Sequence, residues 1–257
     1  MPGRGACGQM DREVLQRIDK KKEQLDSLRP LSVGEVERLR QEFLVEFAYN
    51  SNAIEGSTLT LRETAMILEG ITIDRKPLRE HLEVVGQKDA FAYVLELVEN
   101  ETPLSERVIR EIHSLVLIDK PPQDRGVYRR VPVRILGSRH TPPQPYLVPI
   151  QMEELMGKYE NWRTVLHVVE RVAAFHLSFE VIHPFIDGNG RTGRLLMNLE
   201  LLQAGFPAIN VKFADRERYY GCFGSYFETG STVEMVKLVA EYVEEMVDRY
   251  LDILQQY

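Results

Sequence analysis

Residues 183–194 read HPFIDGNGRTGR, and this stretch concentrates the chemically active groups of the chain. Apolar residues at helical spacing precede it from Val165 to Val181 and follow it from Leu195 to Leu202. This pattern predicts a loop that turns into the N-terminus of a helix. Free backbone N–H groups at a helix start attract phosphate, and glycines let the backbone approach it closely. The stretch therefore predicts an anion-binding loop between two helices.

The composition is that of an ordinary globular protein. Of the 257 residues, 44% are hydrophobic and 28% are charged, so the chain can bury a substantial core. The formal net charge of -7 disfavours a general binder of nucleic acid or anionic membranes. Two cysteines do not make a disulfide framework, and no apolar run approaches the roughly 20 residues that span a bilayer. We therefore expect a cytoplasmic protein without nucleic-acid or membrane partners.

Helical periodicity dominates the chain, which predicts a mainly α fold. Residues 1–10 lack periodicity and are expected to be a mobile tail, so that residues 11–257 form a single domain. The pattern changes only between Pro121 and Pro149, where residues 131–136 alternate with period two and prolines forbid a long helix. We predict a helical bundle with one small β-hairpin, called the flap below. The apolar last helix leaves a homodimer open.

Two helix boundaries are marked by their residue types. Apolar residues recur at helical spacing from Val36 to Ile54, and Gly56 suits the left-handed residue just past a helix end. Thr60 and Glu63 have the spacing of a capping box, in which each side chain bonds to the backbone of the other residue. The sequence therefore predicts a helix that ends before Gly56 and a short helix that begins after Thr60.

The side chains of the loop fit phosphate chemistry. A neutral His183 could take a proton from an attacking hydroxyl, and Asp187 offers hard oxygen ligands for Mg²⁺. Asn189 can donate to a phosphoryl oxygen, while Arg191 and Arg194 point the same way from the first helical turn. The Walker motif is absent, and so is a kinase-like glycine motif before a strand. These residues describe a site for transfer of a nucleotide phosphate.

A rival interpretation takes His176, His183 and Asp187 as a triad that binds Fe or Zn in a hydrolase or oxygenase. It leaves Asn189 and the two arginines of the loop without a role. His176 is also of a type that is commonly structural when it lies on an apolar helix.

The stretch resembles the H-P-F-x-[D/E]-G-N-G-R-x-x-R motif of the Fic family and matches it at every fixed position. Residues 126–129, 137–143 and 176–179 are also similar to family patterns, and the resemblance covers about residues 33–255. It implies a Fic-type helical bundle and an enzyme that transfers AMP from ATP to Ser, Thr or Tyr hydroxyls of target proteins. ATP and a protein substrate would be its partners, and Mg²⁺ its cofactor.

The resemblance implies a role for each matching residue. His183 would deprotonate the target hydroxyl, and Asp187 would hold Mg²⁺ between the α- and β-phosphates. The other positions would bind phosphate: Asn189 the α-phosphate, Gly188 and Gly190 as an anion hole, Arg191 the phosphate tail and Arg194 the γ-phosphate. The flap would pin a target segment by strand-like pairing. Its residues are Val133, Arg134, Ile135, Leu136, Gly137, Ser138 and Arg139.

Two further assignments rest on weaker sequence patterns. Tyr219 and Tyr220 follow the helix that starts at Arg191, where related proteins build a wall for the nucleobase, although a Tyr pair in a helix is also typical of a core. Self-modification at tyrosines and serines near the flap is open as well.

A second motif is similar to the inhibitory sequence [S/T]-x-x-x-E-[G/N] of the same family. It comprises Ser51, Glu55 and Gly56, which would place an inhibitory helix at residues 33–56. If Glu55 reaches Arg194, it occupies the group that should bind the γ-phosphate, and ATP binds with its α-phosphate misaligned. The hypothesis is a self-inhibited protein adenylyltransferase.

Three alternatives stay open because the loop specifies phosphates and not the rest of the ligand. The same site could transfer another phosphate-containing group, such as UMP, a phosphoryl group or phosphocholine. It could remove AMP, with Glu55 orienting a water molecule. From a different class, the chain could be a nucleotide-sensing interaction module without enzymatic function.

Overall fold

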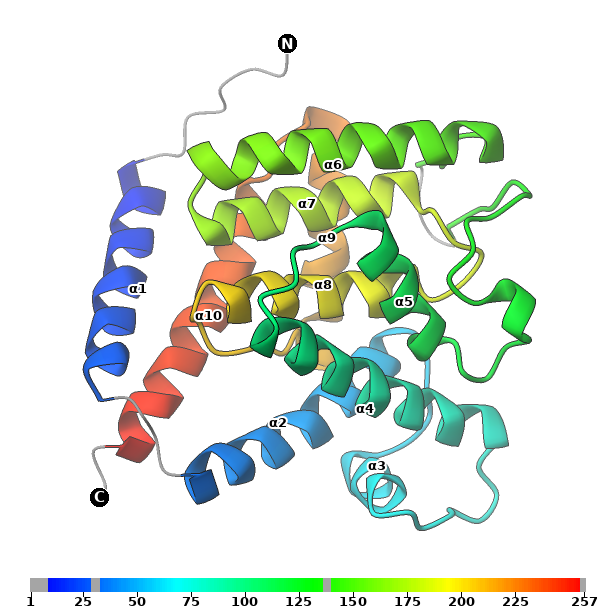
Figure 1. Cartoon of the computed structure of the whole chain (residues 1–257), viewed down its shortest axis with the longest axis horizontal. Helices are drawn as coiled ribbons and strands as arrows, with labels where there is room; N and C mark the ends of the chain where they lie inside the picture. The colour runs from blue at the N-terminus through cyan, green and yellow to red at the C-terminus, as the bar shows by residue number, and fades with distance from the viewer. Residues whose placement is uncertain (1–8, 29–32, 136–139, 255–257) are drawn as a thin grey trace.

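The computed structural model describes residues 9–28, 33–135 and 140–254, and its regular structure within these ranges is helical (Figure 1). The α-helices are α1 (Gln9–Ser27), α2 (Val33–Ile54), α3 (Leu61–Leu68), α4 (Leu78–Glu99), α5 (Glu106–Val116), α6 (Val148–Val165), α7 (Val168–Ile182), α8 (Asn189–Gln203), α9 (Arg216–Thr229) and α10 (Val233–Leu254). Short 3-10 turns lie in the connections, namely η1 (Pro122–Asp124), η2 (Pro145–Leu147) and η3 (Phe213–Asp215). The mainly α prediction is confirmed.

Helix α8 lies at the centre of the molecule and packs against α2, α4, α5 and α7 (Figure 1). Its side chains are buried from Arg191 to Leu201, so polar groups on it need partners inside the protein. The Asn198 amide exchanges hydrogen bonds of 3.0 and 2.7 Å with the backbone of Ile209. Neighbouring helices therefore fix the N-terminus of α8 in a packed frame.

The predicted boundaries of the two early helices are confirmed. Helix α2 ends at Ile54, and Gly56 follows with a left-handed φ of 99°. Thr60 accepts a hydrogen bond from the backbone of Glu63, whose side chain accepts one from the backbone of Thr60. This capping box starts α3 immediately after the end of α2, so the turn that carries Glu55 has defined geometry on both sides.

The last helix is covered by other parts of the chain. Helix α10 packs against α1, α7 and α9, and its apolar side is buried. On the surface of that contact, Arg17 of α1 donates to Glu244 of α10 at 2.5 and 2.7 Å, and Lys21 donates to the same carboxylate at 2.8 Å. Within the described residues, α1 and α7 cover the apolar face of α10, and a homodimer through this helix stays a prediction.

The expected hairpin is not formed by the described part of the flap. Residues 130–135 and 140–144 have no strand assignment, and the four residues between them, Leu136, Gly137, Ser138 and Arg139, lie outside the described residues. Pro132, Pro142 and Pro143 lack the N–H group that a strand ladder needs. The described part of the flap is therefore irregular.

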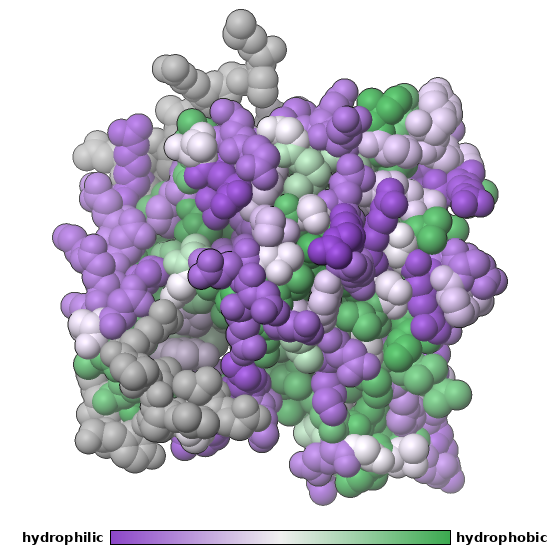
Figure 2. Space-filling model, in the orientation of Figure 1, coloured by the Kyte–Doolittle hydropathy of each residue, from purple (hydrophilic) through white to green (hydrophobic). Residues whose placement is uncertain are grey.

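The surface is mostly hydrophilic over α1 and α6, and hydrophobic residues gather where α3 and the start of α4 lie (Figure 2). Leu61, Ile71 and Leu78 are exposed in that region. No helix within the described ranges is long and apolar enough to cross a bilayer.

Candidate active site

His183 caps the C-terminus of α7 in a strained backbone conformation. Its φ of 48° and ψ of 61° lie in the left-handed region, which non-glycine residues seldom adopt. Its N–H donates to the Phe179 carbonyl at 2.9 Å, and its carbonyl accepts from Arg129 Nε at 2.8 Å. These two bonds hold the backbone of the proposed base on both sides.

The buried Arg129 joins this loop to the base of the flap. Its guanidinium also donates to the carbonyls of Val131, Pro143 and Ile182, at 3.2, 2.6 and 3.4 Å. The Arg129 N–H donates to the Pro184 carbonyl at 2.9 Å. Burial lowers the pKa of Arg129, which is consistent with a cation that has exchanged water for carbonyl oxygens. Sequence reasoning gave this residue no role, although it noted residues 126–129 as a family-like pattern.

Asn189 closes the loop on itself. Its side-chain oxygen accepts from the Phe185 N–H and its amide donates to the Phe185 carbonyl, both at 2.9 Å. Phe185 is buried and stacks on His113 with ring centroids 3.6 Å apart. In this structure the Asn189 amide therefore shapes the loop.

His113, which sequence reasoning did not identify, holds the loop from α5. Gly126 N–H donates to its Nδ1 at 2.9 Å, so its Nε2 carries the hydrogen and donates to the Asp187 carbonyl at 3.0 Å. Burial lowers the pKa of His113 to about 4, which keeps the ring neutral. A neutral histidine thus fixes the backbone next to the proposed Mg²⁺ ligand.

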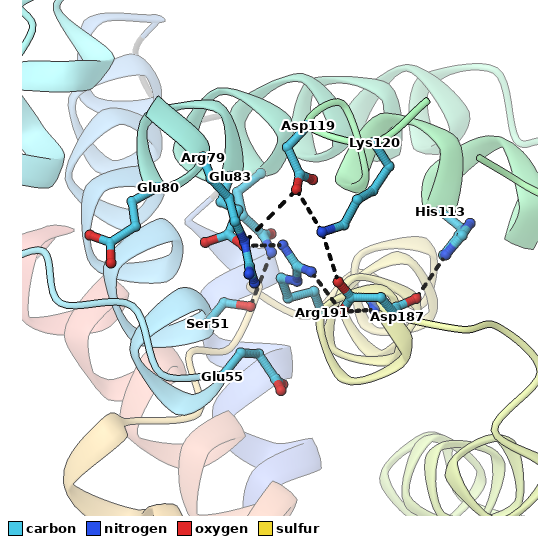
Figure 3. A network of polar contacts seen from close by, with 12 residues as sticks. Ser51, Glu55, Arg79, Glu80, Glu83, His113, Asp119, Lys120, Asp187 and Arg191 are labelled. Atoms are coloured by element: carbon cyan, nitrogen blue, oxygen red, sulfur yellow. Dashed lines mark hydrogen bonds and ion pairs between the residues drawn. The ribbon is translucent and has the colours of Figure 1, made fainter. Parts of the chain in front are cut away.

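The Asp187 carboxylate is surrounded by donors (Figure 3). It accepts from the Gly188 N–H at 2.6 Å and from Arg191 Nη2 at 3.1 Å, and Lys120 Nζ lies 3.4 Å from its other oxygen. Burial acts to raise the pKa of Asp187, but Arg191, the Gly188 amide and Lys120 outweigh it, so the pKa is lowered. The group is ionised, as a ligand for a hard cation must be.

Arg191 connects Asp187 to α4. The guanidinium is 2% exposed, and its Nη1 lies 3.4 Å from Glu83 Oε1. Glu83 also accepts from Arg79 at 2.8 Å, which extends the network to the surface (Figure 3). Glu83 and Lys120 are functional neighbours that the sequence did not reveal.

Arg194 contacts α2 at several points. Its Nη2 donates to the Ser51 carbonyl and to Glu55 Oε1, both at 2.8 Å, and its Nε donates to Ser51 Oγ at 3.1 Å. The contact between Glu55 and Arg194 that the inhibitory motif suggested is therefore present. A Cβ atom placed on Gly190 would collide with Glu55 Oε1, so this carboxylate lies directly against the N-terminus of α8. The N-terminus of α8, the end of a helix that attracts anions, therefore already has a carboxylate beside it.

The two tyrosines of α9 lie in different environments. Tyr219 is 1% exposed, and its hydroxyl bonds to His176 at 2.7 Å and accepts from Arg194 at 3.4 Å. Because its ring is enclosed by the core, it offers no face to a nucleobase. Tyr220 is 41% exposed, and its hydroxyl donates to the Ile54 carbonyl at 3.3 Å. Of the two, Tyr220 has the exposed ring, and its part in a nucleobase wall stays a prediction.

The rival metal triad does not assemble. His176 bonds to Tyr219, whereas Asp187 faces Lys120 and Arg191. Among the described residues, no group of three or more His, Cys, Asp or Glu side chains could hold a metal ion. The flap residues Val133, Arg134 and Ile135 lie in the irregular segment, and the other four flap residues lie outside the described ranges.

Comparison with known proteins gives the same answer for the family. The family model described as Fic/DOC matches residues 103–201. A protein adenylyltransferase Fic from Nematostella vectensis is 36% identical over 250 residues, which cover 95% of this chain and 57% of that protein. The corresponding protein of Drosophila melanogaster is 34% identical over 248 residues, which cover 94% and 49%. The chain spans about half the length of the curated relatives it matches.

Solved structures agree with the observed fold. A Fic domain containing signaling protein from Bacteroides thetaiotaomicron has a TM-score of 0.86 and 25% identity, with 95% of this chain and 98% of that chain covered. Fic-1 from C. elegans has a TM-score of 0.84 and 29% identity, with 96% and 73% covered. The helical fold and the loop at the N-terminus of α8 are those of a Fic-type domain. The chain belongs to the Fic family.

Proposed function

We propose that this protein is an autoinhibited protein adenylyltransferase that transfers AMP from ATP to Ser, Thr or Tyr hydroxyls of target proteins, itself included. The observation that carries the proposal is the Glu55 carboxylate, which bonds to Arg194 and lies against Gly190 at the N-terminus of α8. The relatives named protein adenylyltransferase support the type of reaction.

The N-terminus of α8 would hold the triphosphate of ATP. Gly188 adopts a left-handed φ of 76° there, and no side chain caps the helix, so its first N–H groups suit an anion. Arg191 would contact the phosphate tail and Arg194 the γ-phosphate, which both guanidiniums can bind through paired N–H donors. Asn189 would reach the α-phosphate from the loop that it closes.

His183 would act as general base on the target hydroxyl. Its imidazole takes the hydroxyl proton while the hydroxyl oxygen forms a bond to the α-phosphorus. The bond from that phosphorus to the oxygen bridging to the β-phosphate breaks, and pyrophosphate leaves with the electron pair. The products are an AMP ester of the target and pyrophosphate.

Asp187 is the residue that would hold Mg²⁺. One partly exposed, ionised carboxylate fits this ion, because Mg²⁺ usually takes one or two protein carboxylates and completes its shell with water and phosphate oxygens. When bound, the ion neutralises charge on the α- and β-phosphates.

The flap would present the target segment to His183. A hollow of about 470 Å³ is lined in part by Arg130, Pro145 and Tyr146, which flank the flap in sequence. Val131, Tyr146 and Ile150 are exposed in the same region, which suits a protein partner. Strand-like pairing with the flap would use the target backbone, so the flap does not define which protein is modified.

Glu55 would act as the brake. While it bonds to Arg194, the γ-phosphate lacks its partner and ATP binds in a pose unsuited to attack. Loss of one charge-assisted contact of about 1.5–3 kcal/mol corresponds to roughly 10- to 200-fold in rate or affinity. We therefore expect Glu55→Gly to raise AMP transfer by about that factor.

The decisive experiment incubates wild type, Glu55→Gly and Glu55→Gly/His183→Ala with Mg²⁺ and ATP labelled on the α- or γ-phosphate, alone and with cell lysate. Glu69→Gly is a matched control, because Glu69 also precedes a left-handed glycine at a helix end, whereas the carboxylate that accepts from Arg194 is that of Glu55. We expect protein labelling from the α-label alone, strong in Glu55→Gly, absent with His183→Ala, and unchanged by Glu69→Gly.

Other outcomes would identify the alternatives. Label from the γ-phosphate would indicate phosphoryl transfer, and a product formed only with another nucleotide would change the transferred group. Loss of AMP from a modified target in wild type, but not in Glu55→Gly, would indicate removal of AMP by a water molecule that the 37% exposed Glu55 side chain orients. Tight ATP binding without any covalent product in all variants would favour a nucleotide sensor and overturn the proposal.

A further inference from the structure

Glu180 lies one helical turn before His183 on α7 and faces it. The carboxylate is buried, and its Oε2 lies 3.5 Å from His183 Nδ1. Within the described residues, His183 Nδ1 and Glu180 Oε1 have no hydrogen-bond partner. Buried polar atoms without partners are rare in proteins and call for a functional explanation. This arrangement is suited to a contact that tightens when the site binds its substrates.

A second histidine lies on the other side of the same carboxylate. A Cβ atom on Gly193 would be 3.1 Å from Glu180 Oε1 and 2.7 Å from His176 Nδ1. Both side chains therefore pack against α8 at Gly193. The absence of a side chain at Gly193 is what admits both groups. Helices α7 and α8 can therefore enclose an acidic group between two imidazoles.

The contacts of Tyr219 with His176 and Arg194 indicate which ring nitrogen of His176 carries the hydrogen. Arg194 donates to the Tyr219 hydroxyl oxygen at 3.4 Å, so the Tyr219 O–H is directed to His176 Nε2 at 2.7 Å. Burial, with a smaller effect of Arg194, lowers the pKa of His176 to about 3, and the neutral ring then carries its hydrogen on Nδ1. That N–H is on the side of Glu180.

We propose that Glu180 is the positioning residue of His183. Its carboxylate accepts the hydrogen on His183 Nδ1, which leaves Nε2 unprotonated and directed to the target hydroxyl, and it stabilises the imidazolium that forms when Nε2 takes the proton. His176 Nδ1, which also has no hydrogen-bond partner among the described residues, lies on the other side of this carboxylate. The catalytic part of this inference rests on the function proposed above, whereas the choice of tautomer does not.

The first test observes the tautomer directly. Histidine labelled with ¹⁵N is introduced into the full chain, and His183 is assigned by comparison with His183→Asn. In wild type and Glu180→Gln we expect hydrogen on Nδ1, because the glutamine oxygen still accepts it. In Glu180→Ala we expect the hydrogen to move to Nε2. Ser178→Ala, which removes a polar group from the same helix, should leave the tautomer unchanged.

The second test measures AMP transfer in the Glu55→Gly background. We expect kcat to fall about 10-fold for Glu180→Gln and about 100-fold for Glu180→Ala, with the KM for ATP within about 2-fold of the parent, because Glu180 is not among the proposed nucleotide contacts. Unfolding midpoints identify any variant that fails to fold, and the near-isosteric Gln variant then decides through its kcat.

The outcomes separate this inference from the proposed function. An Nε2–H tautomer in wild type, or an Nδ1–H tautomer that survives in Glu180→Ala, would overturn the positioning role even if AMP transfer is efficient. A tautomer that depends on Glu180 in a protein without AMP transfer would keep the positioning role and reject the proposed function.

Discussion

The two arginines of the loop lie one turn apart on α8 and are equally buried, yet their partners come from different parts of the fold. Arg191 contacts Asp187 from its own loop and Glu83 from α4. Arg194 contacts Ser51 at the end of α2 and Glu55 directly after it. Figure 3 shows these two residues together with Asp187 and Glu83. The contacts of Arg191 therefore include a residue of its own loop, whereas these contacts of Arg194 depend on α2.

This difference indicates that the carboxylates beside the two arginines have different roles at the N-terminus of α8. The carboxylates at Arg191 are part of the site itself, and Asp187 keeps its place when the proposed Mg²⁺ binds. Under the proposed function, the carboxylate at Arg194 has to leave before a γ-phosphate can take its position. Substitutions on the two sides should therefore differ in kind: those around Arg191 should change stability, and those around Glu55 should change activity.

The largest effect is expected for Arg191→Met. Removal of this guanidinium leaves the buried Glu83 carboxylate and Asp187 with fewer cationic partners, which should lower the free energy of unfolding by about 3–5 kcal/mol. Glu55→Gly should lower it by less than about 1 kcal/mol, since Ser51 and Tyr219 still bond to Arg194 and the Glu55 side chain is 37% exposed. Urea unfolding of both variants measures the contrast. Equal losses would mean that the contact of Glu55 with Arg194 stabilises the fold as strongly as the contacts of Arg191.

The second prediction concerns the pH dependence of stability, because a buried neutral histidine lies close to the contacts of each arginine. His113 lies behind Asp187 with its pKa lowered from 6.5 to about 4, and His176 lies behind Arg194 with its pKa lowered to about 3. Protonation therefore favours the unfolded chain: the stability is complete above about pH 6.5 and is lost as the pH falls toward 4. For His113 the loss is up to about 3 kcal/mol.

Urea unfolding between pH 7.5 and 4.5 measures this loss. His113→Asn and His176→Asn should each reduce the slope of unfolding free energy against pH by about half between pH 6.5 and 5, since both rings resist protonation over that interval. A slope that neither substitution changes would show that other groups produce it.

The smallest effect is expected for Lys120→Met. Lys120 Nζ lies 3.4 Å from Asp187, and the two side chains are 28% and 38% exposed, so water screens the pair. The free energy of unfolding should change by less than about 1 kcal/mol, because Arg191 and the Gly188 amide still bond to Asp187. A loss as large as that of Arg191→Met would show that Lys120, and not Arg191, is the main partner of Asp187.

Local sequence predicted the elements whose causes are local. The capping box of Thr60 and Glu63 and the left-handed Gly56 were predictable because each depends on backbone groups a few residues away. The loop of residues 183–194 was predictable for the same reason: its turn, its glycines and the following helix N-terminus are contiguous in sequence.

Residues that act across helices were not predictable in this way. Glu83, His113 and Glu180 lie on helices whose apolar spacing says nothing about which polar residue faces a loop far along the chain. Tyr219 and Tyr220 look alike in sequence, and only the packing of α9 against α7 and α8 buries one and exposes the other. The flap failed as a local prediction because alternation of residues does not supply a partner strand.

Arg129 connects the base of the flap to the loop of His183 through bonds of a different kind from the ion pairs of the site. Its guanidinium donates to the carbonyls of Val131, Pro143, Ile182 and His183, none of which titrates or carries a net charge. Salt screens attraction between exposed charges, and acid neutralises carboxylates, but neither removes a buried bond from a guanidinium to a carbonyl. The alignment of the flap base with His183 should therefore tolerate changes in ionic strength that loosen Lys120 from Asp187.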